Sequence, residues 1–360
     1  MPSTPTFQVR LTGDLLNSQG EPALAGLGID RLANIPNVEH EFLLDQAPAA
    51  DNSEQRSQYE LAIEPWHIDG VNALVVVRPW VKESTFAEGA AELVGIARAG
   101  IGYDKLDLEA CTHSDVVVYN VPDTLVHSTA CSAFTFMIAL SMRLTEQERL
   151  ARSGRWDQQS QVVGNELTGK TLGIVGLGHT ARELCRLAAP FNMRIIAFSP
   201  HADPQQAEQL SVELVKKLET VFRDGDFVSL HNRLLEHNHG MVTADHFALM
   251  KTSAYFINVA RGELIDQAAL TEALAERRIA GAGLDVFATE PLPVDDPLVS
   301  LENVILTPHW LPSTREACRN TMGAVIAGIY RLASGQVPDN VLNRAVLERA
   351  GFREKLSRWQ

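Results

Sequence analysis

The sequence predicts an α/β fold with two parallel-sheet domains, the second of them doubly wound. Short apolar runs alternate with longer helical patterns along the 360 residues, which is typical of parallel sheets covered by helices. An almost wholly apolar segment, residues 129–143, separates two such series. A glycine-rich turn opens the second series, between a strand pattern and a helix pattern. At roughly 100–200 residues per domain, the chain length also fits two domains.

The first series contains five expected strands and one clear helical stretch, Lys105–His113. Residues Gln46–Gln58 are polar and rich in Pro and Ala, and we interpret them as a loop or an insertion. The expected strands are Phe7–Leu11, Val38–Leu44, Ala73–Val77, Glu92–Ala97 and Val116–Asn120.

The apolar segment Thr129–Arg143 predicts a helix that is buried between layers, and we place a domain boundary just before it. A second long helical pattern, Thr314–Ser334, is followed by Gly335 as a C-cap, and the tail after it could rejoin the first domain. The expected domains are therefore residues 1–126 with 315–360, and residues 127–314. Between the two helices the expected strands are Thr171–Val175, Arg194–Phe198, Phe227–Leu230, Tyr255–Asn258, Gly283–Val286 and Val304–Leu306.

Composition excludes several classes of function. The chain has 31 Lys and Arg against 45 Asp and Glu, and a net charge of −14 is repelled by nucleic acid and by anionic membranes. No apolar run reaches membrane-spanning length and no signal peptide is apparent, so we expect a cytoplasmic protein. Cys111, Cys131, Cys185 and Cys318 form no CxxC pair, which argues against a disulfide framework and against a structural zinc site, and no metal is expected.

Residues 176–181 read Gly-Leu-Gly-His-Thr-Ala, a GxGxxA turn in the strand–turn–helix context that dinucleotide binding requires. Gly176 permits the tight turn, Gly178 lets the backbone approach a pyrophosphate, and the small last residue lets helix and strand pack. The N–H groups at the start of the helix, from His179 and Thr180 onward, would bind the phosphates.

The sequence favours NADP over NAD as the dinucleotide, but it leaves both open. A carboxylate that binds the ribose of NAD is expected about 20 residues after the first glycine, and Ser199 stands there instead. The missing acid removes the repulsion against a 2′-phosphate. His201 is close by, and His231 and Arg233 follow a later strand. These residues either bind the adenosine end of the cofactor or are solvated loop residues.

Four polar residues in the last third follow or end expected parallel strands: Arg261, Asp285, Glu290 and His309. Open α/β sheets bind their ligands at that edge. Reduction of a 2-keto acid needs a cation for the carboxylate and carbonyl, and a planar guanidinium suits both. It also needs a proton donor that titrates near neutral pH, and a carboxylate to orient that donor. Arg261, His309 and Glu290 are residues of these three types.

Taken in order, these motifs resemble the D-isomer-specific 2-hydroxy acid dehydrogenase family. The likeness runs from about Val75 to Asn343, which is most of the chain. It rests on Arg98-Ala-Gly-Ile-Gly-Tyr-Asp104, the GxGxxA turn, Asn258-Val-Ala-Arg-Gly262, Leu284-Asp-Val-Phe287 with Glu290-Pro291, and Thr307-Pro-His309.

The resemblance implies two doubly wound domains, Rossmann-like or flavodoxin-like, with an active-site cleft between them. Residues 127–314 would bind the dinucleotide, the other domain would bind the substrate, and the chain would form a homodimer through its nucleotide-binding domain. The implied roles are substrate binding and polarisation for Arg261, acid–base catalysis for Glu290 and His309, cofactor binding for Ala260 and Asp285 (the latter at the nicotinamide carboxamide), and substrate contacts for Arg78, Pro79 and the amides near Ile101 and Gly102.

Several positions depart from the family pattern. The helix after the first domain carries Thr129-Ala130-Cys131-Ser132 where an acid is common, Arg233 replaces a proline, and Trp310 is unusual. The expected function is hydride transfer between a nicotinamide cofactor and a small 2-keto or D-2-hydroxy acid, with glyoxylate or hydroxypyruvate reduction as one version. The alternatives are an enzyme similar to phosphoglycerate dehydrogenase, which would want cations beyond Arg78, and a nicotinamide-sensing binding protein similar to the corepressors of this family.

Overall fold

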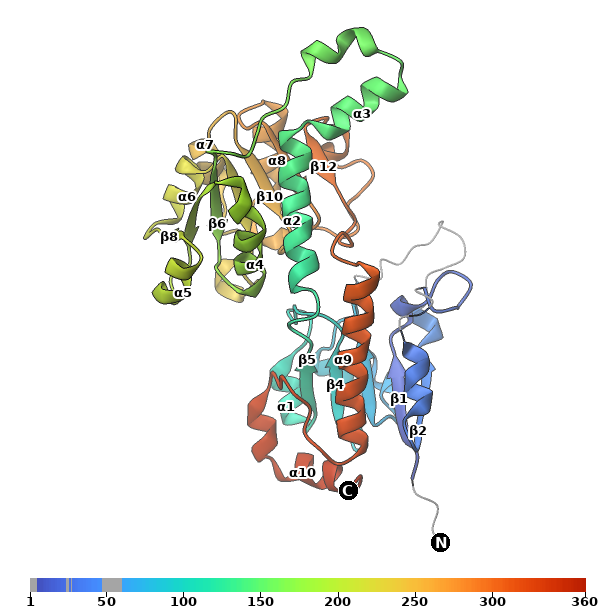
Figure 1. Cartoon of the computed structure of the whole chain (residues 1–360). Coiled ribbons are helices and arrows are strands. Elements are labelled where there is room, and N and C mark those ends of the chain that lie inside the picture. The colour runs from blue at the N-terminus through green and yellow to red at the C-terminus, as the bar shows by residue number, and fades with distance from the viewer. Residues whose placement is uncertain (1–4, 24–25, 27, 47–59) are drawn as a thin grey trace. The chain divides into compact units, whose positions relative to one another are not determined.

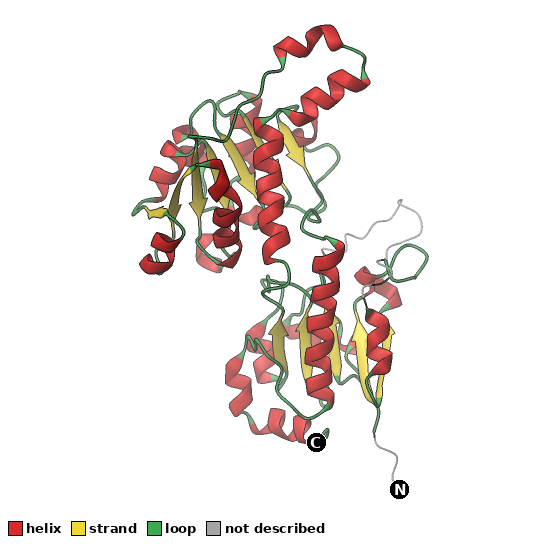
Figure 2. Ribbon diagram, in the orientation of Figure 1, coloured by secondary structure: helices red, strands yellow, loops and turns green. Residues whose placement is uncertain are grey.

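A computed structural model describes residues 5–23, 26, 28–46 and 60–360. These fall into two compact units, residues 1–125 with 314–360 and residues 126–313. The loop expected at Gln46–Gln58 lies outside the described residues, apart from Gln46 itself. Figure 2 shows that each unit is a β-sheet with helices on its faces.

The first unit is built on a five-stranded parallel sheet with the order β2-β1-β3-β4-β5. This is the flavodoxin-like doubly wound order, in which the strand order reverses between β1 and β3. The strands are β1 (Phe7–Leu11), β2 (Val38–Phe42), β3 (Ala73–Val76), β4 (Gly95–Arg98) and β5 (Val117–Asn120), and the helices are α1 (Leu108–His113), α9 (Arg315–Ala333) and α10 (Ala350–Ser357).

The second unit contains a seven-stranded parallel sheet with the order β12-β11-β10-β9-β6-β7-β8, a Rossmann-type arrangement that reverses between β6 and β9. Its strands are β6 (Thr171–Val175), β7 (Arg194–Phe198), β8 (Val212–Leu214), β9 (Phe227–Leu230), β10 (Tyr255–Asn258), β11 (Gly281–Leu284) and β12 (Val304–Leu306). Its helices are α2 (Val126–Ser141), α3 (Leu144–Arg152), α4 (His179–Ala188), α5 (Pro204–Gln209), α6 (Leu218–Asp224), α7 (Ala244–Leu249) and α8 (Gln267–Ala275). Figure 1 labels most of these elements.

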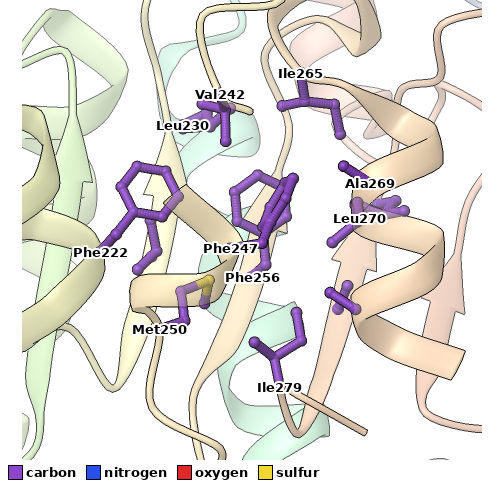
Figure 3. Close-up of a cluster of buried hydrophobic side chains, with 14 of the residues drawn as sticks. Phe222, Leu230, Val242, Phe247, Met250, Phe256, Ile265, Ala269, Leu270 and Ile279 are labelled. Atoms are coloured by element: carbon purple, nitrogen blue, oxygen red, sulfur yellow. The ribbon is translucent and has the colours of Figure 1, made fainter. Parts of the chain in front are cut away.

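Each sheet divides its unit into two apolar cores, because successive side chains of a strand point to opposite faces. In β6, Leu172 and Ile174 join the core under α2 and α4, whereas Val175 joins the core under α6, α7 and α8. Figure 3 shows this second core, with the rings of Phe247 and Phe256 between Phe222 on one side and Leu270 of α8 on the other. These buried strands are therefore apolar on both faces, as the sequence patterns indicated.

The long helix α9 has the ends that its sequence predicts. The Thr314 side chain accepts a hydrogen bond from the amide of Ala317, which caps the first turn. At the other end Gly335 adopts φ +66°, the left-handed conformation that commonly terminates helices. Within the helix, Gly328 has no room for a side chain, since a Cβ there would lie 2.3 Å from the Tyr119 ring of β5.

The observed strands β2, β3 and β5 are one or two residues shorter than expected, and three other strands differ more. The edge strand β8 was not expected, because three residues with Glu213 in the middle give no periodic signal. The strand expected at Glu92–Ala97 is β4 at Gly95–Arg98, and the one expected at Gly283–Val286 is β11 at Gly281–Leu284. The glycines of β11 hide it in the sequence, and packing requires them: a Cβ on Gly283 would lie 2.5 Å from the Phe136 ring.

All four cysteines are free thiols. Burial raises the pKa of Cys111 and of Cys185 to about 12, so both are neutral core residues at physiological pH. No helix in the described ranges is both long enough and apolar enough to span a bilayer.

Candidate active site

The GxGxxA turn lies at the switch point of the second sheet, directly after β6. Gly176 adopts φ +87°, and a Cβ there would lie 2.8 Å from the backbone nitrogen of Asn232, in the segment after β9. The fold itself therefore requires this glycine. Ala181, the last residue of the motif, is fully buried in the core where α4 packs on the sheet.

Gly178 has a different explanation. Its φ of −78° suits any residue, and a Cβ there would meet no atom of the described chain within 4 Å. Neither packing nor backbone conformation requires a glycine at this position, whereas close approach of a ligand would require one. Gly178 is also the N-cap of the ten-residue helix α4, whose first N–H groups and dipole favour a phosphate. The residues present thus fit a dinucleotide.

The residues expected at the adenosine end lie beyond the neighbouring strands. Ser199 directly follows β7 and is half-buried, and His201 is exposed two residues later. His231 follows β9, where its Nε2 and the Ser229 Oγ lie 2.9 Å apart. Burial lowers the pKa of His231 to about 4, so its ring is neutral at physiological pH and adds no charge there. Arg233 is exposed, and it remains the cationic candidate.

Glu290 and His309 meet, as the sequence predicted for an acid–base pair. The Glu290 Oε2 lies 2.8 Å from His309 Nδ1, and the side chains are 16% and 34% exposed. The second carboxylate oxygen, Oε1, accepts a hydrogen bond from the amide of Phe287 at 3.1 Å. The amide of Phe287 therefore fixes the Glu290 carboxylate, and the carboxylate in turn orients the His309 imidazole.

His309 lies in a strained turn that Asp285 holds in place. The φ of His309 is +51°, which costs about 1–2 kcal/mol for a residue with a side chain. Asp285 is 1% exposed, and its Oδ1 accepts hydrogen bonds from Thr307 Oγ1 at 2.6 Å and from the amides of Trp310 and Leu311 at 3.1 and 3.2 Å. The strain persists because both flanks of His309 are tied to one buried carboxylate.

Asp285 is the first residue after β11 and not the end of a strand, so this detail of the sequence-based prediction is wrong. Burial raises the pKa of its carboxyl group, and the hydrogen bond from Thr307 opposes that shift. The structure thus assigns Asp285 a scaffolding contact with the His309 turn. Its expected contact with the nicotinamide stays a prediction.

Arg261 follows β10 in a loop that two other residues fix. The buried Asn258 side chain accepts a hydrogen bond from the amide of Ala260 and donates one to the carbonyl oxygen of Arg261, at 3.0 and 2.8 Å. Gly262 packs against the neighbouring loop so closely that a Cβ would lie 1.9 Å from the Phe287 carbonyl carbon. The loop of Arg261 therefore lies against the loop that Glu290 anchors.

The remaining expected substrate residues belong to the first unit, at the carboxyl edge of its sheet. Arg78 follows β3, and its amide donates to Asp14 Oδ2 at 2.9 Å, while its Nη1 lies 3.6 Å from the same oxygen. The Asp14 side chain is fully buried and Arg78 is 17% exposed, so the carboxylate fixes the direction of the guanidinium. Pro79 is buried beside it.

Ile101 and Gly102 lie in the loop after β4, the next strand of the same sheet. Their amides donate to no acceptor within the described ranges 5–23, 28–46 and 60–360. Two neighbouring backbone N–H groups that donate no hydrogen bond within the described chain are suited to binding a carboxylate.

Three residues that support these sites were not predicted: Asp14, Asn258 and Thr307. Each is a short polar side chain at or just past a strand or expected strand end, but many polar residues occupy such positions. The sequence did contain Asn258 and Thr307 within the quoted motifs. Their hydrogen-bond partners are 2–22 positions away in the chain, and only the folded sheet brings the more distant ones together.

Comparison with known proteins identifies the family. The model for the NAD-binding domain of D-isomer-specific 2-hydroxyacid dehydrogenases matches residues 134–310. The glyoxylate reductase of Korarchaeum cryptofilum is 37% identical over 265 residues, which cover 72% of this chain and 79% of that protein. The D-3-phosphoglycerate dehydrogenase of Methanocaldococcus jannaschii is 38% identical over 271 residues, 75% of this chain but 51% of that protein.

A crystal structure of a Thermus thermophilus protein matches with a TM-score of 0.79 at 27% identity, and the match covers 93% of this chain and all of the other. The contact between Glu290 and His309, the GxGxxA turn and the similar proteins all point to the same family. The chain belongs to the D-isomer-specific 2-hydroxyacid dehydrogenase family, and it is an oxidoreductase that uses NAD or NADP with 2-keto and D-2-hydroxy acids.

Proposed function

We propose that this enzyme reduces a small 2-keto acid of the glyoxylate or hydroxypyruvate type to the corresponding hydroxy acid. Relatives named glyoxylate reductase are 35–37% identical over 72–80% of the chain. The observation that carries the proposal is the 2.8 Å contact between Glu290 and His309 in a turn pinned by Asp285. This is the arrangement that delivery of a proton to a developing alkoxide needs.

Each residue then has a chemical role. When bound, the reduced nicotinamide would supply a hydride to the carbonyl carbon of the substrate. Arg261 binds the substrate and polarises its carbonyl oxygen, on which negative charge develops. Because His309 Nδ1 faces Glu290, we assign proton delivery to Nε2, and Glu290 balances the positive charge of the protonated ring. The amides of Ile101 and Gly102, with Arg78, bind the substrate carboxylate.

We further propose that NADP is the preferred cofactor. Ser199 replaces the carboxylate that would repel a 2′-phosphate, and the exposed Arg233 is the cation that would bind it. His231 is excluded from that charge role by its lowered pKa. The contacts of His201 and Thr180 with the cofactor stay predictions.

The expected homodimer is supported by an arm of the second unit. The segment of residues 142–164 leaves the end of α2, includes α3 and a short 3-10 helix, and projects from the sheet (Figure 1). The base of the arm is closed by two hydrogen bonds between Ser141 and Asn165, at 2.7 and 2.8 Å. Large apolar side chains are exposed along it: Met142 55%, Leu144 56%, Trp156 66% and Val163 70%. Exposed apolar groups of this kind mark interaction surfaces. A cytoplasmic location stays a prediction from the sequence.

A second candidate is oxidation of a phosphorylated 2-hydroxy acid. The sequence alone offered no cations beyond Arg78 for a phosphate. In the structure, Lys82 Nζ and Lys105 Nζ lie 5.7 and 5.3 Å from the centroid of Trp80, two residues after Arg78. Two further cations thus converge near this loop.

A turnover screen tests these proposals. Oxidation of NADPH and of NADH is followed at neutral pH with glyoxylate, hydroxypyruvate, pyruvate, phenylpyruvate and phosphohydroxypyruvate. We expect consumption with glyoxylate or hydroxypyruvate, and faster turnover with NADPH. Preference for phosphohydroxypyruvate would support the second candidate. Tight cofactor binding without turnover of any keto acid would contradict both and favour a nicotinamide-sensing binding protein.

A further inference from the structure

Arg98, the last residue of β4, folds its side chain over the loop that follows the strand. Its Nε donates to the Gly102 carbonyl oxygen at 2.6 Å, and its Nη1 donates to the Ala99 carbonyl oxygen at 2.8 Å. A Cβ on Gly100 would lie 2.8 Å from Nη1, so the guanidinium lies directly against the backbone and the glycine makes room for it. One side chain therefore closes residues 99–102 into a fixed turn.

Asn120 holds the same loop from the neighbouring strand. It ends β5 and is paired in register with Arg98. Its Nδ2 donates to the Ile101 carbonyl oxygen at 2.8 Å, and the amide of Val121 donates to the Gly100 carbonyl oxygen at 3.4 Å. Asn120 is 6% exposed, so little water competes for these contacts. Each of the four carbonyl oxygens of residues 99–102 thus accepts a hydrogen bond.

These contacts also fix the direction of the amides. In a planar trans peptide the C=O and N–H bonds point in opposite directions. The carbonyl groups of Gly100 and Ile101 point toward the end of β5, so the N–H groups of Ile101 and Gly102, which share those two peptide planes, point away from it. Neither N–H is used by the described part of the chain. The loop therefore presents two donors on its other side.

We propose that Arg98 and Asn120 are positioning residues for substrate binding: they hold the two peptide planes so that the amides of Ile101 and Gly102 bind the substrate carboxylate. This inference rests on the proposed function, because the carboxylate is the anion that the two donors would bind. Arg98 would act on the substrate only indirectly, through the backbone of residues 99–102 that it holds.

The two parts of the Arg98 contribution can be separated. A guanidinium also brings positive charge near an anion site in a chain with a net charge of −14. Lysine keeps that charge but lacks the planar fork that spans two carbonyl oxygens. For Asn120, aspartate keeps the shape but replaces the donor by an oxygen that repels the Ile101 carbonyl. Arg98→Lys and Asn120→Asp therefore remove the clamp while leaving charge or shape in place.

The chain offers matched controls in the same unit. Arg10 of β1 donates from Nη1 to the carbonyl oxygens of Trp66, His67 and Asp69, which is a similar clamp on a different loop. Asn72 is 7% exposed and donates to the Glu92 carbonyl oxygen at the amino edge of the sheet. Arg10→Lys and Asn72→Asp make the same chemical changes away from the proposed carboxylate site.

The experiment measures steady-state kinetics with the best keto acid, the dissociation constant of NADPH by fluorescence, and the affinity for oxamate by calorimetry, together with the unfolding temperature of each variant. We expect Arg98→Lys and Asn120→Asp to raise KM and weaken oxamate binding by about tenfold each, as loss of a well-placed donor does. The value of kcat should change less than KM, and NADPH affinity should stay within twofold. The two controls should lower only the unfolding temperature.

If the wild type turns over a keto acid, and Arg98→Lys and Asn120→Asp keep its KM and its oxamate affinity, the inference is overturned. The proposed function is then left intact. If the wild type turns over no keto acid, the proposed function fails, and oxamate calorimetry still decides the inference. Weaker binding in these two variants than in the controls supports it. Equal oxamate affinity in these two variants and in the controls, or no oxamate binding by the wild type, overturns it.

Discussion

The two glycines of the GxGxxA turn should respond in opposite ways to replacement by alanine. Gly178 has φ −78° and open space at its Cβ position, whereas Gly176 has φ +87° and would place a Cβ 2.8–2.9 Å from atoms of Asn232. Only Gly176 is therefore required by the fold. Gly178 should be required by the ligand.

The magnitudes follow from these geometries. At Gly178, alanine lowers the conformational entropy of the unfolded chain, which stabilises the protein by about 0.4–1 kcal/mol. Alanine is also a poorer N-cap than glycine, which destabilises it. The free energy of unfolding should therefore change by less than about 1 kcal/mol. At Gly176, the left-handed conformation costs about 1–2 kcal/mol and the backbone overlap adds more, for a total of roughly 2–4 kcal/mol. A loss of that size lowers the unfolding temperature by about 4–16 °C in a domain of this length.

Thermal unfolding with and without NADPH measures both effects. At a ligand concentration of about 100 Kd, the cofactor should stabilise the wild type by about 2.7 kcal/mol. A methyl group against the pyrophosphate should raise Kd at least about tenfold, which removes about 1.4 kcal/mol of that stabilisation. Fluorescence titration gives Kd directly. If Gly178→Ala binds NADPH as tightly as the wild type, the glycine does not serve close approach of a phosphate and our account of the turn is wrong.

The remaining predictions concern the chemistry, the cofactor and pH. His309→Gln should lower kcat by about 10²-fold or more with NADPH affinity unchanged; near-full activity would remove His309 as the proton donor. Arg261→Lys keeps the charge but loses the planar fork, so KM should rise strongly; an unchanged kcat/KM would exclude Arg261 from the site. Ser199→Asp should shift the ratio of kcat/KM from NADPH towards NADH, and no shift would place the 2′ position elsewhere. Burial lowers the pKa of Lys355 from the ordinary 10.5 to about 8. The unfolded chain therefore binds more protons between these values, and the free energy of unfolding should rise with pH from about 8 to 10.5 relative to Lys355→Met. A pH-independent difference in chemical denaturation would contradict this.

The sequence determined the fold class because parallel strands buried on both faces appear as short continuous apolar runs that alternate with helical patterns. Strands such as β6 and β10 were placed at their correct bounds, and the capped ends of α9 were visible as Thr314 and Gly335. It failed where packing overrides local pattern. In β11 the glycines demanded by Phe136 and by the Asn303 carbonyl weaken the strand signal, and β8 is too short to show a period.

The sequence by itself also determined which residue types carry the chemistry, since Arg261, Glu290 and His309 stand in motifs whose side chains suit keto acid reduction. Only the tertiary structure decided how they are held. Asp285 fixes the strained turn of His309, Asn258 fixes the loop of Arg261, and Arg98 and Asn120 orient the amides of Ile101 and Gly102. Asn258 and Arg98 bind backbone of their own loops, within four positions of themselves. The contacts of Asp285 and Asn120 instead join the ends of neighbouring parallel strands, 19–26 positions apart in the chain. Such ends are adjacent only in the folded sheet, so no local pattern records which strand ends will meet.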